Sequence, residues 1–191
     1  MIWNRHSGLV GQHALLSASK YHWLNYDEDK LDRMFHLQEA AKRGTELHAF
    51  AHEAIRLGIK LPRNSKTLNM YVNDAIGYRM TPELLLFYSP NCFGTPDALA
   101  YSEKSRALRI SDLKTGTTEA SVKQLLVYAG LFFLEYGREL DVTPNDVTTE
   151  LRIYQNDEVR EYLGDPAEIM WIMDRIITAD IRINRLREEA L

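Results

Sequence analysis

Three residues in the middle of the chain have the types and spacing needed to hold a metal ion beside a positive charge. Asp97 follows a turn at residues 94–96, and Asp112 ends a later apolar segment, with Lys114 two residues beyond it. Carboxylate oxygens are preferred ligands of hard divalent cations, and residues two apart on a strand point to the same face. The pattern therefore predicts a site where a cation, a water molecule and an ammonium group meet, which suits the hydrolysis of phosphate diesters.

The spacing of an acidic residue two positions before a lysine occurs twice, and only one copy ends a strand pattern. Residues 28–30 (Glu-Asp-Lys) lie in a polar run that is typical of a solvated approach to a helix. Residues 107–113 alternate instead, so that Leu108 and Ile110 share a strand face with Asp112. The second copy is therefore the candidate site.

The order of the remaining patterns predicts an α/β fold, a mixed central sheet flanked by helices. A polar loop separates strands 95–101 and 107–113, which we expect to form a hairpin that places Asp97 opposite Asp112. Gly44 lies within the first helical pattern as a potential interruption. Helical patterns cover residues 31–57, 69–79, 119–136 and 166–188, and strand patterns cover 84–88, 95–101, 107–113 and 147–154.

Length and composition bound the class of protein. With 191 residues and 45% hydrophobic content, the chain is long enough for one domain over residues 1–191 with an N-terminal helical arm. A single cysteine, Cys92, excludes an internal disulfide, a four-cysteine zinc site and a four-cysteine iron-sulfur cluster. There is no export-signal pattern and no apolar run of about 20 residues. We therefore expect a cytoplasmic protein with no membrane contact.

The formal net charge of -4 argues against broad coating of nucleic acid and leaves room for a local basic channel. Arginines of the last helical pattern have two interpretations, a DNA groove or a solvated face, and nothing in the sequence decides between them. They are Arg175, Arg182, Arg185 and Arg187.

Several motifs resemble, in order along the chain, those of the PD-(D/E)XK nuclease superfamily, and within it the RecB-like branch of phage and bacterial DNA exonucleases. Residues 44–48 (Gly-Thr-Glu-Leu-His) resemble that branch's helical histidine motif, residues 94–97 its second motif and residues 112–114 its third. Gln124 and Tyr128 resemble the pair that follows on a helix. Residues 13–26 are similar to the usual opening, so the resemblance extends over residues 13–136 and rests on ordered co-occurrence.

The resemblance implies a restriction-endonuclease-like core and a role for each residue. The metal, Mg²⁺ or Mn²⁺, would be held by His48, Asp97, Asp112 and the backbone carbonyl of Leu113. Lys114 would orient and help activate the attacking water. Gln124 and Tyr128, four apart on one helical face, would hold substrate phosphate or support the lysine.

Each of these residues also has a structural interpretation. Asp97 alone suits a turn, His48 alone suits helix packing, and Tyr128 suits an apolar core. His48 and His52 have the i,i+4 spacing of a shared zinc ion, although Ala49 stands where a zinc protease motif requires glutamate.

The function that the resemblance implies is metal-dependent DNA hydrolysis, most simply by an exonuclease of phage or bacterial DNA recombination or repair. The expected partners are DNA and a recombination or single-strand-annealing protein, in a bacterial or phage-infected cell. The alternatives are an endonuclease of the same fold and a non-catalytic nucleic-acid-binding protein. Digestion polarity, strand preference and oligomeric state have no signature in the sequence.

The predicted ligand set also indicates a preference among metals. An imidazole nitrogen beside carboxylates favours Mn²⁺ over Mg²⁺ in affinity, because affinity rises along the first-row series. We expect Ca²⁺ to bind and to support little cleavage.

Overall fold

A computed structural model describes residues 7–9 and 14–190 of the chain. The chain divides into two compact units, Met1–Thr45 and Glu46–Leu191, and helix α1 (Glu28–Leu57) crosses the boundary. The prediction of a single domain stays a prediction. No helix in the described ranges has the length and apolar character needed to cross a membrane.

The first unit is helical throughout its described elements. Two 3-10 helices, η1 (Ser7–Leu9) and η2 (Ala18–Asn25), precede the first part of α1. The carboxylate of Asp27 accepts a hydrogen bond from the Lys30 backbone N–H at 2.7 Å and so caps the start of α1. Residues 28–30 are thus exposed in the first helical turn. His13, where the family-like opening begins, lies outside the described residues.

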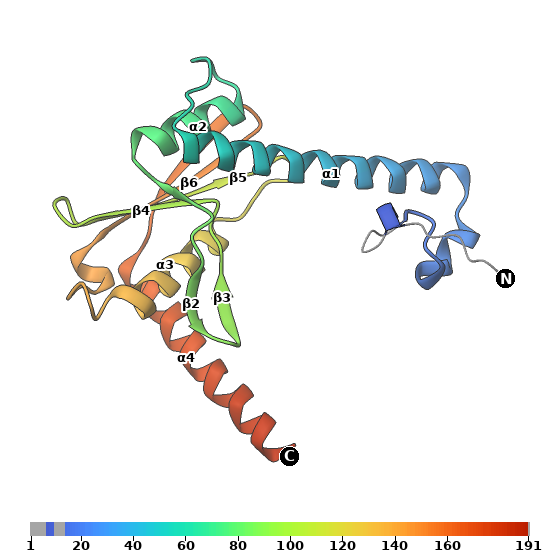
Figure 1. Cartoon of the computed structure of the whole chain (residues 1–191). Helices are drawn as coiled ribbons and strands as arrows, with labels where there is room; N and C mark the ends of the chain where they lie inside the picture. The colour runs from blue at the N-terminus through green and yellow to red at the C-terminus, as the bar shows by residue number, and fades with distance from the viewer. Residues whose placement is uncertain (1–6, 10–13, 191) are drawn as a thin grey trace. The chain divides into compact units, whose positions relative to one another are not determined.

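A five-stranded mixed sheet forms the centre of the second unit, as the sequence predicts (Figure 1). The strand order is β1-β4-β5-β6-β7; β5 and β6 are parallel and the other pairs are antiparallel. Their bounds are Thr81–Pro82, Ala98–Ser102, Ala107–Leu113, Thr148–Gln155 and Glu158–Leu163. Strands β2 (Leu86–Ser89) and β3 (Cys92–Gly94) form a separate hairpin.

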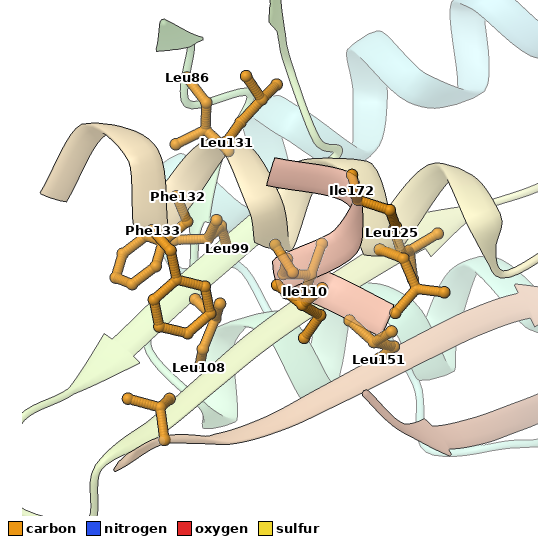
Figure 2. Close-up of a cluster of buried hydrophobic side chains, with 14 of the residues drawn as sticks. Leu86, Leu99, Leu108, Ile110, Leu125, Leu131, Phe132, Phe133, Leu151 and Ile172 are labelled. Carbon is orange, nitrogen blue, oxygen red and sulfur yellow. The ribbon is translucent and has the colours of Figure 1, made fainter. Parts of the chain in front are cut away.

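Helices cover both faces of the sheet, because its central strands are apolar on both sides. α3 (Lys123–Tyr136) and α4 (Pro166–Glu189) lie on one face, and α2 (Thr67–Gly77) lies on the other (Figure 1). Figure 2 shows Leu108 and Ile110 of β5 packed with leucine and phenylalanine side chains of α3. Leu113 contributes to a second cluster, formed with α2 and the last turns of α1. The two faces of β5 thus alternate as its sequence predicts.

The predicted starts of two elements and one predicted helix interruption are wrong. The strand expected from residue 95 begins at Ala98, so Asp97 directly precedes β4. The helix expected from residue 119 begins at Lys123, because the polar groups of residues 116–120 bond to Gln155 instead of forming a helical turn. Gly44 does not interrupt α1. An isolated helical glycine costs only about 1 kcal/mol relative to alanine, and a long helix tolerates it.

Three strands were not expected from the sequence. β1 and β3 are only two and three residues long, too short to show a period. β7 is an edge strand with mostly exposed side chains, so it lacks the apolar alternation of a buried strand. A two-residue turn, Asn156-Asp157, joins it to β6, and both turn residues have positive φ. Such turns match the twist of a hairpin and favour asparagine and aspartate.

Candidate active site

The β4–β5 hairpin brings the two predicted carboxylates together. Ala98 pairs with Ser111 in the antiparallel register, so Asp97 stands opposite Asp112 at the next position. Oδ2 of Asp97 accepts a hydrogen bond from the Leu113 backbone N–H at 2.7 Å, and its own carbonyl accepts one from Glu83 at 3.1 Å. Asp97 is therefore held at both its backbone and its side chain, with one oxygen committed to the end of β5.

Asp112 and Lys114 lie on the face of β5 that α3 covers. The Asp112 residue is 3% exposed, and its Oδ2 lies 3.0 Å from Nζ of Lys114. Nζ also donates a hydrogen bond to Oε1 of Gln124 at 3.1 Å, and Nε2 of Gln124 donates to the Tyr128 hydroxyl at 3.0 Å. The structure thus joins four of the predicted residues in one chain of polar contacts from β5 to α3.

His48 reaches the same carboxylates from α1. Its Nδ1 lies 3.4 Å from Oδ1 of Asp97. This contact raises the pKa of His48 above its ordinary value, against the opposing effect of partial burial. The predicted ligand histidine is therefore placed beside the first predicted ligand aspartate.

The surroundings of Asp112 disfavour the charged form of its carboxyl group. Burial raises its pKa, and the nearby Asp97 raises it further, while Lys114 acts in the opposite direction. Although Oδ2 is close to Lys114, it receives no hydrogen bond from any group in the described part of the chain. A buried carboxylate oxygen without a hydrogen bond is an atom that a hard cation accepts as a ligand.

The residues fit a divalent cation by donor type. Two carboxylates and an imidazole nitrogen are the oxygen and nitrogen donors that Mg²⁺ and Mn²⁺ use. In the ranges that the structure describes, no three histidine, cysteine or acidic side chains are gathered closely enough to form a complete metal cluster. Leu113, whose carbonyl was predicted as a further ligand, ends β5 between Asp112 and Lys114.

The closeness of Tyr128 explains why residue 94 is a glycine. A Cβ atom at position 94 would lie 2.9 Å from Cε1 of the tyrosine, closer than real Cβ contacts. Glycine here lets β3 pass against α3, so the motif at residues 94–97 places Tyr128 as well as Asp97.

The geometry of His48 and His52 differs from that of a shared zinc site. Nδ1 of His52 lies 3.1 Å from Oε2 of Glu83, while His48 faces Asp97. Glu83 itself has φ +49° and donates its backbone N–H to the Asp97 carbonyl. The two histidines thus contact separate carboxylates.

Gln155 is a site-supporting residue that the sequence did not reveal. It is 4% exposed, and its Nε2 donates to the carbonyls of Gly116 and Thr118 at 2.6 and 2.8 Å. Its Oε1 accepts from Ala120 N–H at 3.2 Å and from Arg160 at 3.0 Å. These bonds hold the loop that connects Lys114 to α3. The only signal in the sequence is a glutamine at the end of an apolar strand.

The α4 arginines are exposed on their helix, which is consistent with either interpretation. Comparisons of the chain with protein-family models, curated proteins and solved structures gave no match.

Proposed function

We propose that this protein is a divalent-metal-dependent deoxyribonuclease of the PD-(D/E)XK superfamily, with a restriction-endonuclease-like core, and that it acts as a RecB-like exonuclease in phage or bacterial recombination or repair. The observation that carries the proposal is the placing of two contact pairs, His48 with Asp97 and Lys114 with Asp112, at opposite positions of the β4–β5 hairpin. Residues from α1, the β4–β5 hairpin and α3 converge there, which supports the roles that the resemblance implies.

Asp97 and Asp112 would hold Mg²⁺ or Mn²⁺, with His48 and the Leu113 carbonyl completing the set. A bound cation would supply charge neutralisation at the phosphate and a more acidic water. The raised pKa of Asp112 supports this role, because burial and the nearby Asp97 both disfavour its charged form and a bound cation would offset them.

Lys114 would position the reacting groups. Its ammonium has three donors, of which one bonds to Gln124 and one faces Asp112. The third is then directed by these two contacts and can hold the attacking water or a phosphate oxygen. Tyr128 fixes Gln124 and so restricts the lysine from the α3 side.

The decisive experiment is digestion of end-labelled DNA by the wild type, Lys114→Ala and Lys123→Ala. Linear and covalently closed circular substrates, each single- and double-stranded, are incubated with Mg²⁺, Mn²⁺, Ca²⁺ or EDTA. We expect loss of linear DNA with Mn²⁺ or Mg²⁺ and little with Ca²⁺ or EDTA. Lys114→Ala should lower the rate by at least about 100-fold. Lys123→Ala, an exposed lysine at the start of α3, should cut normally.

Other outcomes would reassign the protein. Cleavage of closed circles would make it an endonuclease of the same fold. DNA binding without cleavage under any condition would make it a non-catalytic binding protein.

A further inference from the structure

A cavity of about 390 Å³ opens directly beside Lys114. Leu113 and Lys114 form part of its wall and also belong to the proposed metal site. A group bound in this cavity would therefore lie against Lys114, the residue that would act on the phosphate. The volume lies within the range of small-molecule sites, about 300–1,000 Å³.

The cavity wall combines apolar faces with a few polar groups. Leu47 of α1, Leu68 of α2 and Leu113 of β5 supply the apolar part, and Thr115 and Asn156 supply hydroxyl and amide groups. The Asn156 side chain makes no hydrogen bond to other described residues, so its donor and acceptor remain available for a ligand. A nucleobase has the matching character, because its faces are apolar and its edge carries donors and acceptors.

The polar wall is held in place before any ligand arrives. Asp157, beside Asn156 in the β6–β7 turn, accepts hydrogen bonds from the Thr67 backbone N–H at 2.9 Å and from Lys66 Nζ at 2.7 Å. The Thr67 hydroxyl in turn accepts from the Asp157 N–H at 2.7 Å. These bonds join the turn to the start of α2, and Lys66 balances the carboxylate charge. A wall fixed in this way lowers the ordering cost of binding.

We propose that this cavity binds one unstacked nucleoside of the DNA strand, the one adjoining the phosphate to be cleaved. The proposal rests on the proposed function, since Lys114 defines which phosphate is meant. A base inside a duplex is stacked on both faces and paired on its edge, so it must leave the helix to enter. The enzyme should consequently prefer single strands, or duplex ends that fray, to blunt stable ends.

The test fills the cavity from an exposed loop position. Thr115 lines the cavity and Thr117 does not, although both are exposed in the same loop. Thr115→Phe and Thr117→Phe are therefore matched variants, and Leu47→Trp fills the cavity from α1. Binding is measured by the fluorescence anisotropy of 2-aminopurine deoxynucleoside monophosphate. Cleavage is measured on single-stranded and blunt GC-ended duplex substrates.

We expect Thr115→Phe and Leu47→Trp to weaken nucleotide binding by about tenfold or more, while Thr117→Phe behaves like the wild type. The wild type should cut single strands faster than blunt duplexes. Equal binding by all variants, or a wild type that does not bind the nucleotide, overturns the inference even if cleavage is normal. Loss of binding restricted to the cavity variants, in a protein that cuts no DNA, keeps the nucleoside site and removes the proposed nuclease function.

Discussion

Asp112 is a proposed metal ligand, and its buried carboxylate also lowers the stability of the metal-free protein. The carboxylate is buried and its pKa is raised, so the native protein holds this proton more tightly than the unfolded chain. A group of this kind favours the native state at low pH. Its contribution falls as pH rises from the unfolded value of about 4 through the raised native value. Metal-free protein at neutral pH therefore contains an unfavourable charge.

Replacing Asp112 with asparagine removes this buried charge. In EDTA at pH 7 the variant should be more stable than the wild type by on the order of 1 kcal/mol, because a neutral amide replaces the buried charge and the partly exposed Lys114 can hydrate. Mn²⁺ should raise the melting temperature of the wild type and leave that of the variant unchanged. Thermal unfolding with and without Mn²⁺ measures both effects.

Asp174→Asn is the matched control, since Asp174 is exposed on α4. It should keep the wild-type response to Mn²⁺. An Asp112→Asn protein that is less stable in EDTA, or that responds fully to Mn²⁺, would contradict this account of the carboxylate.

At the scale of elements, the loop between β5 and α3 depends on a side chain far along the chain. Gln155 bonds to the loop groups Gly116, Thr118 and Ala120. Removing the Gln155 side chain leaves these backbone groups without their hydrogen-bond partner and creates a small buried cavity. Gln155→Ala should therefore lower the free energy of unfolding by about 2 kcal/mol and slow cleavage, because the loop after Lys114 loses its anchor.

Urea unfolding followed by circular dichroism measures this loss. The control is Gln38→Ala on the exposed surface of α1, which should change stability by less than about 0.5 kcal/mol. If Gln155→Ala were as stable as the control, the loop would be held by other contacts.

In the β2–β3 hairpin, Gly94 lies against the ring of Tyr128. In Gly94→Ala the added methyl group would displace the Tyr128 ring, which then loses its hydrogen bond from Gln124. Cleavage should fall by about tenfold or more while the fold is retained. Gly77→Ala, where a Cβ meets open space, should leave the cleavage rate unchanged. Cleavage rates of the two variants at equal folded concentration decide the point; equal rates would place Tyr128 outside the mechanism.

Across the molecule, the sequence predicted an element correctly where the periodicity of its own apolar residues defines it. β5 occupies the predicted range 107–113, and its hairpin with β4 places Asp97 opposite Asp112 as expected. α1 ends at Leu57 as predicted, since its apolar positions recur at helical intervals.

What could not be predicted depends on contacts between distant residues. Gln155 acts on residues 35 to 39 positions earlier, and hydrophobic periodicity carries no information about such pairs. The edge strand β7 is exposed, so it has no apolar face to show. The cavity beside Lys114 collects residues from α1, α2, β5 and two loops, and no motif spans them. The Asn156-Asp157 turn was recognisable in principle from its residue types.

The position of Cys92 has a further consequence for experiments on the intact protein. It is the only cysteine in the chain. It lies in β3 and packs against the core cluster, and burial raises the pKa of its thiol. The thiol is only partly buried, so it should react with a thiol reagent more slowly than an exposed cysteine, and faster when the β2–β3 hairpin loosens.

Asp180 of α4 accepts hydrogen bonds from Ser89 and Asn91 in that hairpin. Asp180→Ala should speed the thiol reaction, because it removes these bonds and also removes a charge that raises the pKa of the Cys92 thiol, while Asp174→Asn should not. β3 ends at Gly94, three residues before Asp97. The rate of the Cys92 thiol reaction therefore reports how firmly the strand that leads into the proposed metal site is held.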